Sequence, residues 1–359
     1  MSVYAVDIGG SSLKHGLTTA STYKITKNYM RMSAKQHAIQ IRRPVERGYV
    51  VNWTLQGDIL QDILPNNKEH TLLLTTPLFT PEKLLLQQEE VVFEEFQFEK
   101  YSSVVPQSMV FKPIPFACVV DLGFSSTYIV PLIDGKVLLS AVRRLNVGGK
   151  LLTNYLKECV SYRQWNMMDS FELIDEVKEA VCKCSLSFIN DMKEFANGTA
   201  TTLQWALPDF VQTKNGYLME PQTAVPDSTQ VLRLGLEQIT VPEILFHPSD
   251  IGLDQAGLHG GIVEAISACP EHFQSLLYQN IILTGGTSQL PNLKERLEKE
   301  LRPLVPAEYL IQFHTTNDPI GAVWKGCQAL ASSGSMPIVT KAEYQEHGSN
   351  ICRTRLGNL

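Results

Sequence analysis

The sequence lacks an uninterrupted hydrophobic run long enough to cross a membrane, and it lacks an excess of positive charge. Its most apolar stretch, residues 116–133, contains Asp121 and a serine pair, so we expect no membrane anchor. Lysine and arginine number 31 against 37 aspartate and glutamate, which leaves a net charge of -6. A surface built to neutralise nucleic-acid phosphates is therefore not expected.

The cysteines form no recognisable zinc-binding or disulfide pattern. All seven are scattered, their number is odd, and no pair of CxxC motifs stands at zinc spacing from histidines. A reducing compartment inside the cell is the simplest interpretation. Asp7 interrupts the first residues before a signal-peptide hydrophobic region could form, which also predicts a protein that stays inside the cell.

What the sequence does contain is one acidic turn made twice. VDIGGSS, residues 6–12, and VDLGFSS, residues 120–126, share a valine, an aspartate, a glycine and a serine pair in the same order. Each turn follows a short apolar run, so each predicts a buried strand that ends in a carboxylate, Asp7 or Asp121. The 359 residues are enough for two domains, and strands alternate with helices in both halves. The expected fold class is α/β, with two similar domains.

Two further junctions support this organisation. Asp134-Gly135 lies between two β-rich runs, which predicts a tight hairpin. Gly285-Gly286 follow a third buried strand and precede an amphipathic helix. A strand followed by glycines and then a helix thus occurs again in the second half.

Other segments carry weaker signals. The pattern predicts a helix over 171–188, with Cys182 and Cys184 facing the core from it. Residues 206–230 and 303–319 are rich in proline and polar residues, so we interpret both as long surface connections.

A strand that ends in aspartate before a glycine/serine turn is suited to holding phosphate. Glycines let the backbone approach closely, and successive N–H groups form a concave nest for anionic oxygens. The aspartate can hold a hydrated Mg²⁺ that contacts the phosphates. One such turn is more often only a turn. Two of them, facing each other from two domains, would hold a di- or triphosphate in the cleft between the domains.

This layout resembles the actin, sugar-kinase and heat-shock-70 ATPase superfamily, and the sequence resembles actin over about residues 1–330. The matching blocks follow in the actin order: VDIGGSSLKHG, VVDLGFSSTYIVPLIDG, RRLNVGGKLLTNYL, VKEAVC, VPEILFHPSDIG, NIILTGGTSQLP and AVWKG. The resemblance implies an actin-like fold around a central nucleotide cleft. The implied domains are 1–120, with a reduced small subdomain around 20–52 and completion by 320–359, and 121–319, with a small subdomain around 165–240.

The resemblance also implies which residues line the cleft. Lys14 stands where the family has its phosphate-contacting lysine, and Lys178 with Glu179 would contact adenosine. ATP with Mg²⁺ is the implied cofactor, and Asp7 and Asp121 would hold the metal through water. No catalytic residue is assigned. The full expected set is Asp7, Gly9, Gly10, Ser11, Lys14, Asp121, Gly123, Ser125, Gly149, Lys178, Glu179, Gly285 and Gly286.

A closer resemblance is to one nuclear branch of the actin-related proteins. It is carried by RPVERGYVVNW, EEFQF, NVGGKLLTNYLKE, SYRQ and VPEILFHPSDIG. It implies a nuclear protein, with a cytoplasmic pool, that is a structural subunit of a chromatin remodelling complex of the SWR/SRCAP type. Such a complex exchanges an ordinary histone dimer for one that carries histone variant Z. The implied partners are its ATPase subunit and a small zinc-finger subunit, with histones or the nucleosome contacted indirectly.

Three positions depart from actin inside the cleft. Phe124 stands where actin has a further aspartate, and Ile320 replaces the lysine that lies against the adenine. Actin's water-orienting glutamine aligns with Pro106, although a shift of one residue would restore it as Gln107. We therefore do not expect hydrolysis, because the groups that hold and activate the attacking water are lost. The alternative is a nucleotide-hydrolysing enzyme of the same superfamily.

Two more departures argue against filament formation. The stretch between Leu17 and Arg43 is too short for actin's long DNase-contacting loop, which a filament uses for its longitudinal contact. Asp250 replaces an apolar residue of the plug that bridges filament strands, and burying an unpaired carboxylate is unfavourable. We expect a chain that does not polymerise and that binds its partners through 206–230 and 303–319.

Overall fold

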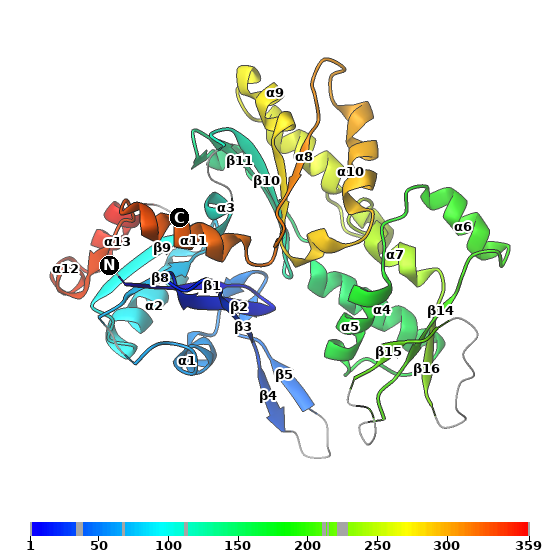
Figure 1. Cartoon of the computed structure of the whole chain (residues 1–359), viewed down its shortest axis with the longest axis horizontal. Coiled ribbons are helices and arrows are strands. Elements are labelled where there is room, and N and C mark those ends of the chain that lie inside the picture. Colours follow the sequence, from blue (N-terminus) through cyan, green and yellow to red (C-terminus); the bar gives the residue numbers. More distant parts are fainter. Residues whose placement is uncertain are drawn as a thin grey trace.

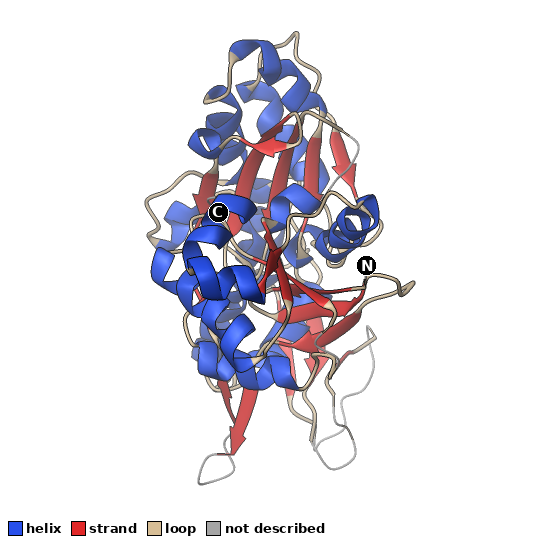
Figure 2. Ribbon diagram, turned by 90° about the vertical axis from the view of Figure 1, so that its left-hand side faces the viewer, coloured by secondary structure: helices blue, strands red, loops and turns tan. Residues whose placement is uncertain are grey.

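The computed structural model of the chain describes residues 2–33, 39–66, 69–110, 114–209, 213, 215–220 and 229–357. It contains two α/β domains, each built around a six-stranded sheet with helices packed against it (Figures 1 and 2). The α/β class expected from the sequence is confirmed. None of the helices within these described ranges combines the length and the apolar character that crossing a membrane requires.

The first sheet contains strands from both ends of the chain. Its order is β19-β9-β8-β1-β2-β3. The strands are β1 Val3–Ile8, β2 Ser12–Leu17, β3 Lys24–Lys27, β8 Thr71–Thr75, β9 Lys100–Val104 and β19 Val339–Thr340. The helices of this domain are α1 Trp53–Gln61, α2 Glu82–Glu90, the π-helical turn Val91–Glu95, α3 Pro106–Met109, α11 Ala322–Ser333, α12 Lys341–His347 and α13 Ser349–Leu356.

Two small hairpins extend the first domain towards the second. They pair β4 Met30–Ser33 with β5 Ile39–Arg42, and β6 Val45–Glu46 with β7 Tyr49–Val50. The β4–β5 hairpin projects away from the first sheet (Figure 1). Residues 34–38 at its tip lie outside the described residues.

The second sheet has the order β12-β11-β10-β17-β18, and β13 also pairs with β11. The strands are β10 Ala117–Leu122, β11 Thr127–Ile133, β12 Lys136–Val137, β13 Arg143–Leu145, β17 Ile281–Thr284 and β18 Phe313–Thr315. The helices are α4 Gly149–Arg163, α5 Phe171–Val181, α6 Phe188–Ala196, α7 Glu237–Glu243, α8 Leu258–Ser267, α9 Glu271–Gln279 and α10 Leu293–Leu301, with short 3₁₀ turns at Leu139–Ala141, Pro248–Ile251, Gly286–Gln289 and Arg302–Leu304. A separate three-stranded sheet pairs β14 Leu203–Ala206 with β15 Tyr217–Leu218 and β16 Val231–Leu234.

The two large sheets repeat one plan. β1 pairs antiparallel with β2 and parallel with β8, and β10 pairs in the same way with β11 and β17. In both sheets the acidic turn joins the antiparallel pair, at the carboxyl end of the parallel strands, where ligands of α/β sheets usually bind. A shared hydrophobic cluster that includes Val3, Val119 and Trp324 joins the two sheets. The repeated turn in the sequence therefore marks a repeated structural unit.

Some local predictions are confirmed and others are wrong. Asp134 and Gly135 form the hairpin turn between β11 and β12, with φ of 51° and 71°. The helix predicted over 171–188 ends at Val181, because Cys182 has an extended backbone with ψ of 140°. Cys182 and Cys184 are buried, as expected, but they lie after the helix rather than on it.

The two expected surface connections differ from each other. Residues 303–319 are not simply a connection, because they contain β18, whose Phe313 is buried and pairs with Ile281 of β17. Within 206–230, the structure describes β15 and the flanking residues, and 210–212, 214 and 221–228 lie outside the described residues.

Candidate functional site

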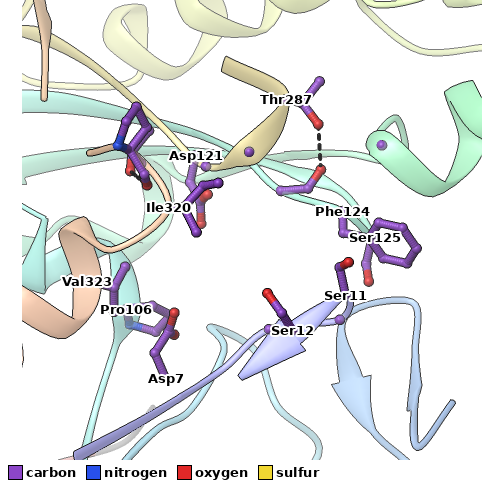
Figure 3. A pocket seen from close by; sticks show the side chains of 18 of the residues that line it. Asp7, Ser11, Ser12, Pro106, Asp121, Phe124, Ser125, Thr287, Ile320 and Val323 are labelled. Carbon is purple, nitrogen blue, oxygen red and sulfur yellow. Dashed lines mark hydrogen bonds between the residues drawn. The ribbon is translucent and has the colours of Figure 1, made fainter. Parts of the chain in front are cut away.

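A cavity of about 450 Å³ lies between the two domains, where both acidic turns meet (Figure 3). The structure brings all thirteen residues of the expected set together around it. Asp7 and Ser11 reach the cavity from the first domain, and Asp121 and Ser125 reach it from the second (Figure 3). Residues far apart in the sequence thus share one site.

Asp7 is held on two sides by its own domain. The hydroxyl of Thr75, at the end of β8, donates to Asp7 Oδ1 at 3.0 Å. Lys14 Nζ lies 3.6 Å from Asp7 Oδ2. Lys14 is the residue directly opposite Asp7 in the β1–β2 pair, so both side chains emerge on one face. The first carboxylate therefore has a cation and a hydroxyl donor beside it.

Asp121 has a different environment. Its Oδ2 accepts a hydrogen bond of 2.8 Å from the neutral amide of Gln107. Burial raises the pKa of Asp121 to about 6; the amide of Gln107 lowers it, the charge of Asp7 raises it and Lys14 lowers it. A cation brought into the cavity would stabilise the charged form of this carboxyl.

Pro106 and Gln107, the two residues that could stand for actin's glutamine, both border the cavity but differ in what they contact. Pro106 opens α3, a helix position that suits a residue without an N–H group, and Gln107 carries the polar side chain to Asp121. Gln107 is 2% exposed, and its Oε1 is buried without a hydrogen-bond partner among the described residues. Of the two residues considered from the sequence for the position of actin's glutamine, Gln107 is therefore the one whose side chain reaches Asp121, and its Oε1 is enclosed by protein.

The backbone at Gly10 and at Gly149 lies so close to side chains of neighbouring segments that an added Cβ would force those side chains to move. A Cβ added at Gly10 would lie 2.4 Å from Ser125 Oγ, across the cleft. One added at Gly149 would lie 3.2 Å from Thr287 Oγ1, whose hydroxyl donates to the carbonyl of Gly123 at 3.2 Å (Figure 3). Backbone groups therefore line this part of the cavity, as a phosphate nest requires.

The two glycines after β17 have different roles. Gly285 has a φ of +86°, and a Cβ there would lie 2.4 Å from the carbonyl oxygen of Leu122. A Cβ at Gly286 would meet no atom within 4 Å. The path of the chain requires glycine at the first position, whereas the second borders the open space of the cavity.

Lys178, expected to contact adenosine, already has partners. Its Nζ lies 2.5 Å from Asp175 Oδ1 and 2.9 Å from Thr153 Oγ1, and its side chain is buried. Glu179 is exposed at the rim of the cavity, and Ile320 lines the same cavity with an apolar side chain. Lys178 therefore borders the cavity as half of an ion pair.

Phe124, which the resemblance places where actin has a further aspartate, borders the cavity. Its ring lies beside Ser125 at the edge of the cavity (Figure 3), and the ring of Phe171 meets it edge-on at 5.9 Å. A phenyl ring can neither accept a proton nor polarise water. At position 124 the cavity is therefore bordered by an apolar ring rather than by a carboxylate.

Sequence reasoning missed three residues of the site. Asp175 stands three residues before Lys178 on one helix, so its ion pair could have been found from that spacing. Thr75 and Thr287 come from other strands and turns, and only the tertiary structure brings them to Asp7 and Gly123.

The donors around the cavity fit a nucleotide with hydrated Mg²⁺. Backbone N–H groups of the turns and Lys14 could hold phosphate oxygens, and Asp7 and Asp121 could hold the metal through water. Magnesium would neutralise phosphate charge there. In the part of the chain that the structure describes, no three or more His, Cys, Asp and Glu side chains gather as ligands for a directly bound metal.

Two α/β domains of one plan, with acidic glycine turns facing across a shared cavity, define the actin-like class of nucleotide-cleft proteins. Residues 7–356 match the family described as actin, and the chain belongs to that family. Its relatives point to one branch. Actin-related protein 6 of Arabidopsis thaliana is 40% identical over 361 residues, which cover 88% of this chain and 85% of the relative. Actin-like protein ARP6 of Yarrowia lipolytica is 38% identical over 329 residues (89% and 85%), and actin-related protein 6 of Dictyostelium discoideum is 31% identical over 407 (88% and 83%).

Proposed function

We propose that the chain is a non-polymerising nuclear actin-related protein, a structural subunit of a SWR/SRCAP-type chromatin remodelling complex that deposits histone variant Z into nucleosomes. Its partners in this proposal are the ATPase subunit and a small zinc-finger subunit, with histones or the nucleosome contacted indirectly. The observation that carries the proposal is the similarity, over 88% of the chain, to a relative named actin-related protein 6.

In this proposal the cleft holds ATP with Mg²⁺ as a structural ligand. The raised pKa of Asp121 supports it, because a carboxylate whose charged form is disfavoured by burial gains from a metal bound close to it. A ligand that contacts both domains would stabilise the fold by about 2.7 kcal/mol at a hundred times its dissociation constant.

Affinity purification of the tagged chain from nuclear extract tests the scaffold role. We expect it to sediment with a very large complex that exchanges histone dimers. Replacing residues 206–230 with a short Gly/Ser linker should leave the two large sheets intact and remove partners, because the described residues of this segment belong to neither sheet. Sedimentation as a monomer without co-purifying subunits would contradict the proposal.

The absence of filaments is tested by high-speed pelleting with magnesium and salt. Asp250 lies exposed in the 3₁₀ turn Pro248–Ile251, so a filament contact at this point would bury its carboxylate. We expect the chain to stay in the supernatant while conventional actin pellets in parallel. A sedimenting filament would be evidence against this part of the proposal.

A second function, nucleotide hydrolysis, is favoured by one observation. Gln107 borders the cavity and holds Asp121 there, and a side-chain amide at such a place could orient a water molecule. The missing carboxylate at Phe124 argues against it, since loss of general-base help typically lowers a rate about 10²–10⁴-fold. A single-turnover phosphate-release assay separates the two functions. Release no faster than in Gln107→Ala supports the scaffold, and release that Gln107→Ala abolishes supports the enzyme.

A further inference from the structure

Arg43 connects the two domains at the edge of the cleft. It follows β5 of the first domain, and its guanidinium carbon lies 4.7 Å from the ring centre of Phe124 and 5.2 Å from that of Phe171. Both rings belong to the second domain. The ring of Tyr29, from the first domain, lies 4.9 Å away on the same guanidinium. These distances are within the roughly 6 Å range over which a cation is attracted to an aromatic face.

The same guanidinium is tied to the first acidic turn. Its Nη1 donates to the carbonyl oxygen of Gly10 at 3.4 Å. Burial lowers the pKa of Arg43, and the charge of Asp175 opposes that shift. Asp175 lies on α5 of the second domain, so this electrostatic attraction also acts between the domains. One side chain thus contacts or attracts groups from both acidic turns and from α5.

A neighbouring set of contacts also joins the first domain to α5 of the second. Glu172 follows Phe171 on α5 and accepts hydrogen bonds from the hydroxyl of Tyr29 and from Arg31 Nη2, the latter at 3.0 Å. Because Arg31 is exposed, its ion pair alone contributes little. The aromatic stack around Arg43 is partly buried, so its contacts are less screened by solvent.

We propose that Arg43, Phe124 and Phe171 form a latch that holds the cleft closed without a bound nucleotide. The second acidic turn presents the ring of Phe124 to the cleft, and that ring contacts Arg43 of the opposite domain. Closure then depends on contacts within the chain rather than on phosphate held between the turns. The two domains, and any partner surface that spans them, keep one relative position whether or not the cleft is filled.

Hydrogen–deuterium exchange on the full chain without nucleotide tests the latch. Arg43→Met keeps an unbranched side chain and removes the guanidinium. Amides of the two turns, residues 9–12 and 123–126, should then exchange about tenfold faster, since the two cation–aromatic contacts between the domains are lost. Arg353→Met is the matched control, because Arg353 pairs with Glu82 inside the first domain. It should leave both turns unchanged, and unchanged exchange in β10 and β17 would show that each variant is folded.

Two substitutions of Phe124 test the same contact if Arg43→Met does not fold. Phe124→Leu keeps apolar volume without an aromatic face and should also speed exchange of the turns. Phe124→Tyr keeps the face and should match the wild type. The latch is overturned if Phe124→Leu and Arg43→Met exchange like the wild type. It is equally overturned if the wild-type turns exchange as fast as those of the variants and slow only when ATP and Mg²⁺ are added. The assay uses neither partner subunits nor hydrolysis, so its failure is separate from failure of the proposed function.

Discussion

The two acidic turns share a sequence pattern but not an electrostatic environment. Asp7 has Lys14 Nζ at 3.6 Å and the hydroxyl of Thr75 at 3.0 Å. Asp121 has the neutral amide of Gln107 at 2.8 Å, and burial raises its pKa to about 6. One carboxylate is stabilised by its own domain, and the other would be stabilised by an incoming cation.

The difference comes from residues outside the repeated pattern. In the register of β1 and β2, Lys14 stands opposite Asp7, whereas in the register of β10 and β11, Tyr128 stands opposite Asp121. The repeated turn sets the path of the backbone in both domains, and the neighbouring strand sets the charge. The same turn sequence can therefore place its aspartate beside a cation in one domain and beside a neutral amide in the other.

The largest effect on stability is expected at Gly285, which follows β17 and packs against the second acidic turn. Alanine at Gly285 would bring its Cβ within 2.4 Å of the Leu122 carbonyl oxygen, at a φ of +86°. We expect Gly285→Ala to lower the free energy of unfolding by about 3 kcal/mol or more in urea denaturation. Gly286→Ala is the matched control, since a Cβ there meets no atom within 4 Å, and it should change stability by about 0.5 kcal/mol or less. Equal losses of stability in the two variants would show that the second turn does not depend on the close contact between Gly285 and Leu122.

Replacing each aspartate with asparagine should change the free energy of unfolding in opposite directions at the two turns. The pKa of Asp121 in the folded chain, about 6, exceeds its ordinary value of 3.8, so its contribution to stability is present at low pH and is lost as pH rises from about 4 to about 6. At pH 7 Asp121→Asn should therefore raise the free energy of unfolding by about 2 kcal/mol, and near pH 4 by little. Asp7→Asn loses an ion pair and should lower it by about 1 kcal/mol.

Urea denaturation of both variants across this pH range, without Mg²⁺, measures the difference. An effect of Asp121→Asn that is the same at every pH would mean that the second carboxyl is not perturbed. The comparison between the turns would then have no electrostatic basis.

Removing the amide beside Asp121 should have an intermediate effect. Gln107→Leu leaves the charged carboxyl without its donor, and we expect a loss of about 1–2 kcal/mol at pH 7. The pKa of Asp121 should rise further, because the Gln107 bond lowers it. Carboxyl chemical shifts in an NMR titration report that pKa. Pro106→Ala, at the adjacent position that also lines the cavity, should not move it. A pKa that responds to Pro106→Ala and not to Gln107→Leu would contradict the role given to the Gln107 amide.

The smallest effect on stability is expected at Lys14. Its ion pair with Asp7 spans 3.6 Å, so Lys14→Met should lower the free energy of unfolding by less than about 1 kcal/mol without nucleotide. The stabilisation by excess ATP and Mg²⁺, about 2.7 kcal/mol at a hundred times the dissociation constant, should fall markedly because a phosphate contact is lost. Thermal unfolding with and without ligand measures both. Lys24→Met, exposed on β3, is the control. If Lys14→Met keeps the full ligand stabilisation, Lys14 does not contact phosphate.

Sequence reasoning succeeded where structure depends on neighbours along the chain. The hairpin at Asp134-Gly135 followed from two residues that accept positive φ, and the two acidic turns followed from apolar runs that end in Asp-x-Gly. It was wrong where distant contacts override local pattern. The helix from Phe171 stops at Val181, since the next residues bond to other segments, Lys183 N to Gln238 O and Cys184 N to Pro291 O. β18 forms in a polar, proline-rich stretch because it pairs with β17.

Apolar runs, repeated acidic turns and glycines in the sequence predicted the repeated plan, and the resemblance to actin implied the thirteen site residues, all of which line the cavity. Tertiary contacts alone show that Gln107 rather than Pro106 reaches Asp121, and that Arg43 lies beside the rings of Phe124 and Phe171. Those contacts join segments on different elements. Whether such side chains meet depends on register, helix phase and the distance between two packed domains, and local spacing along the chain contains none of these.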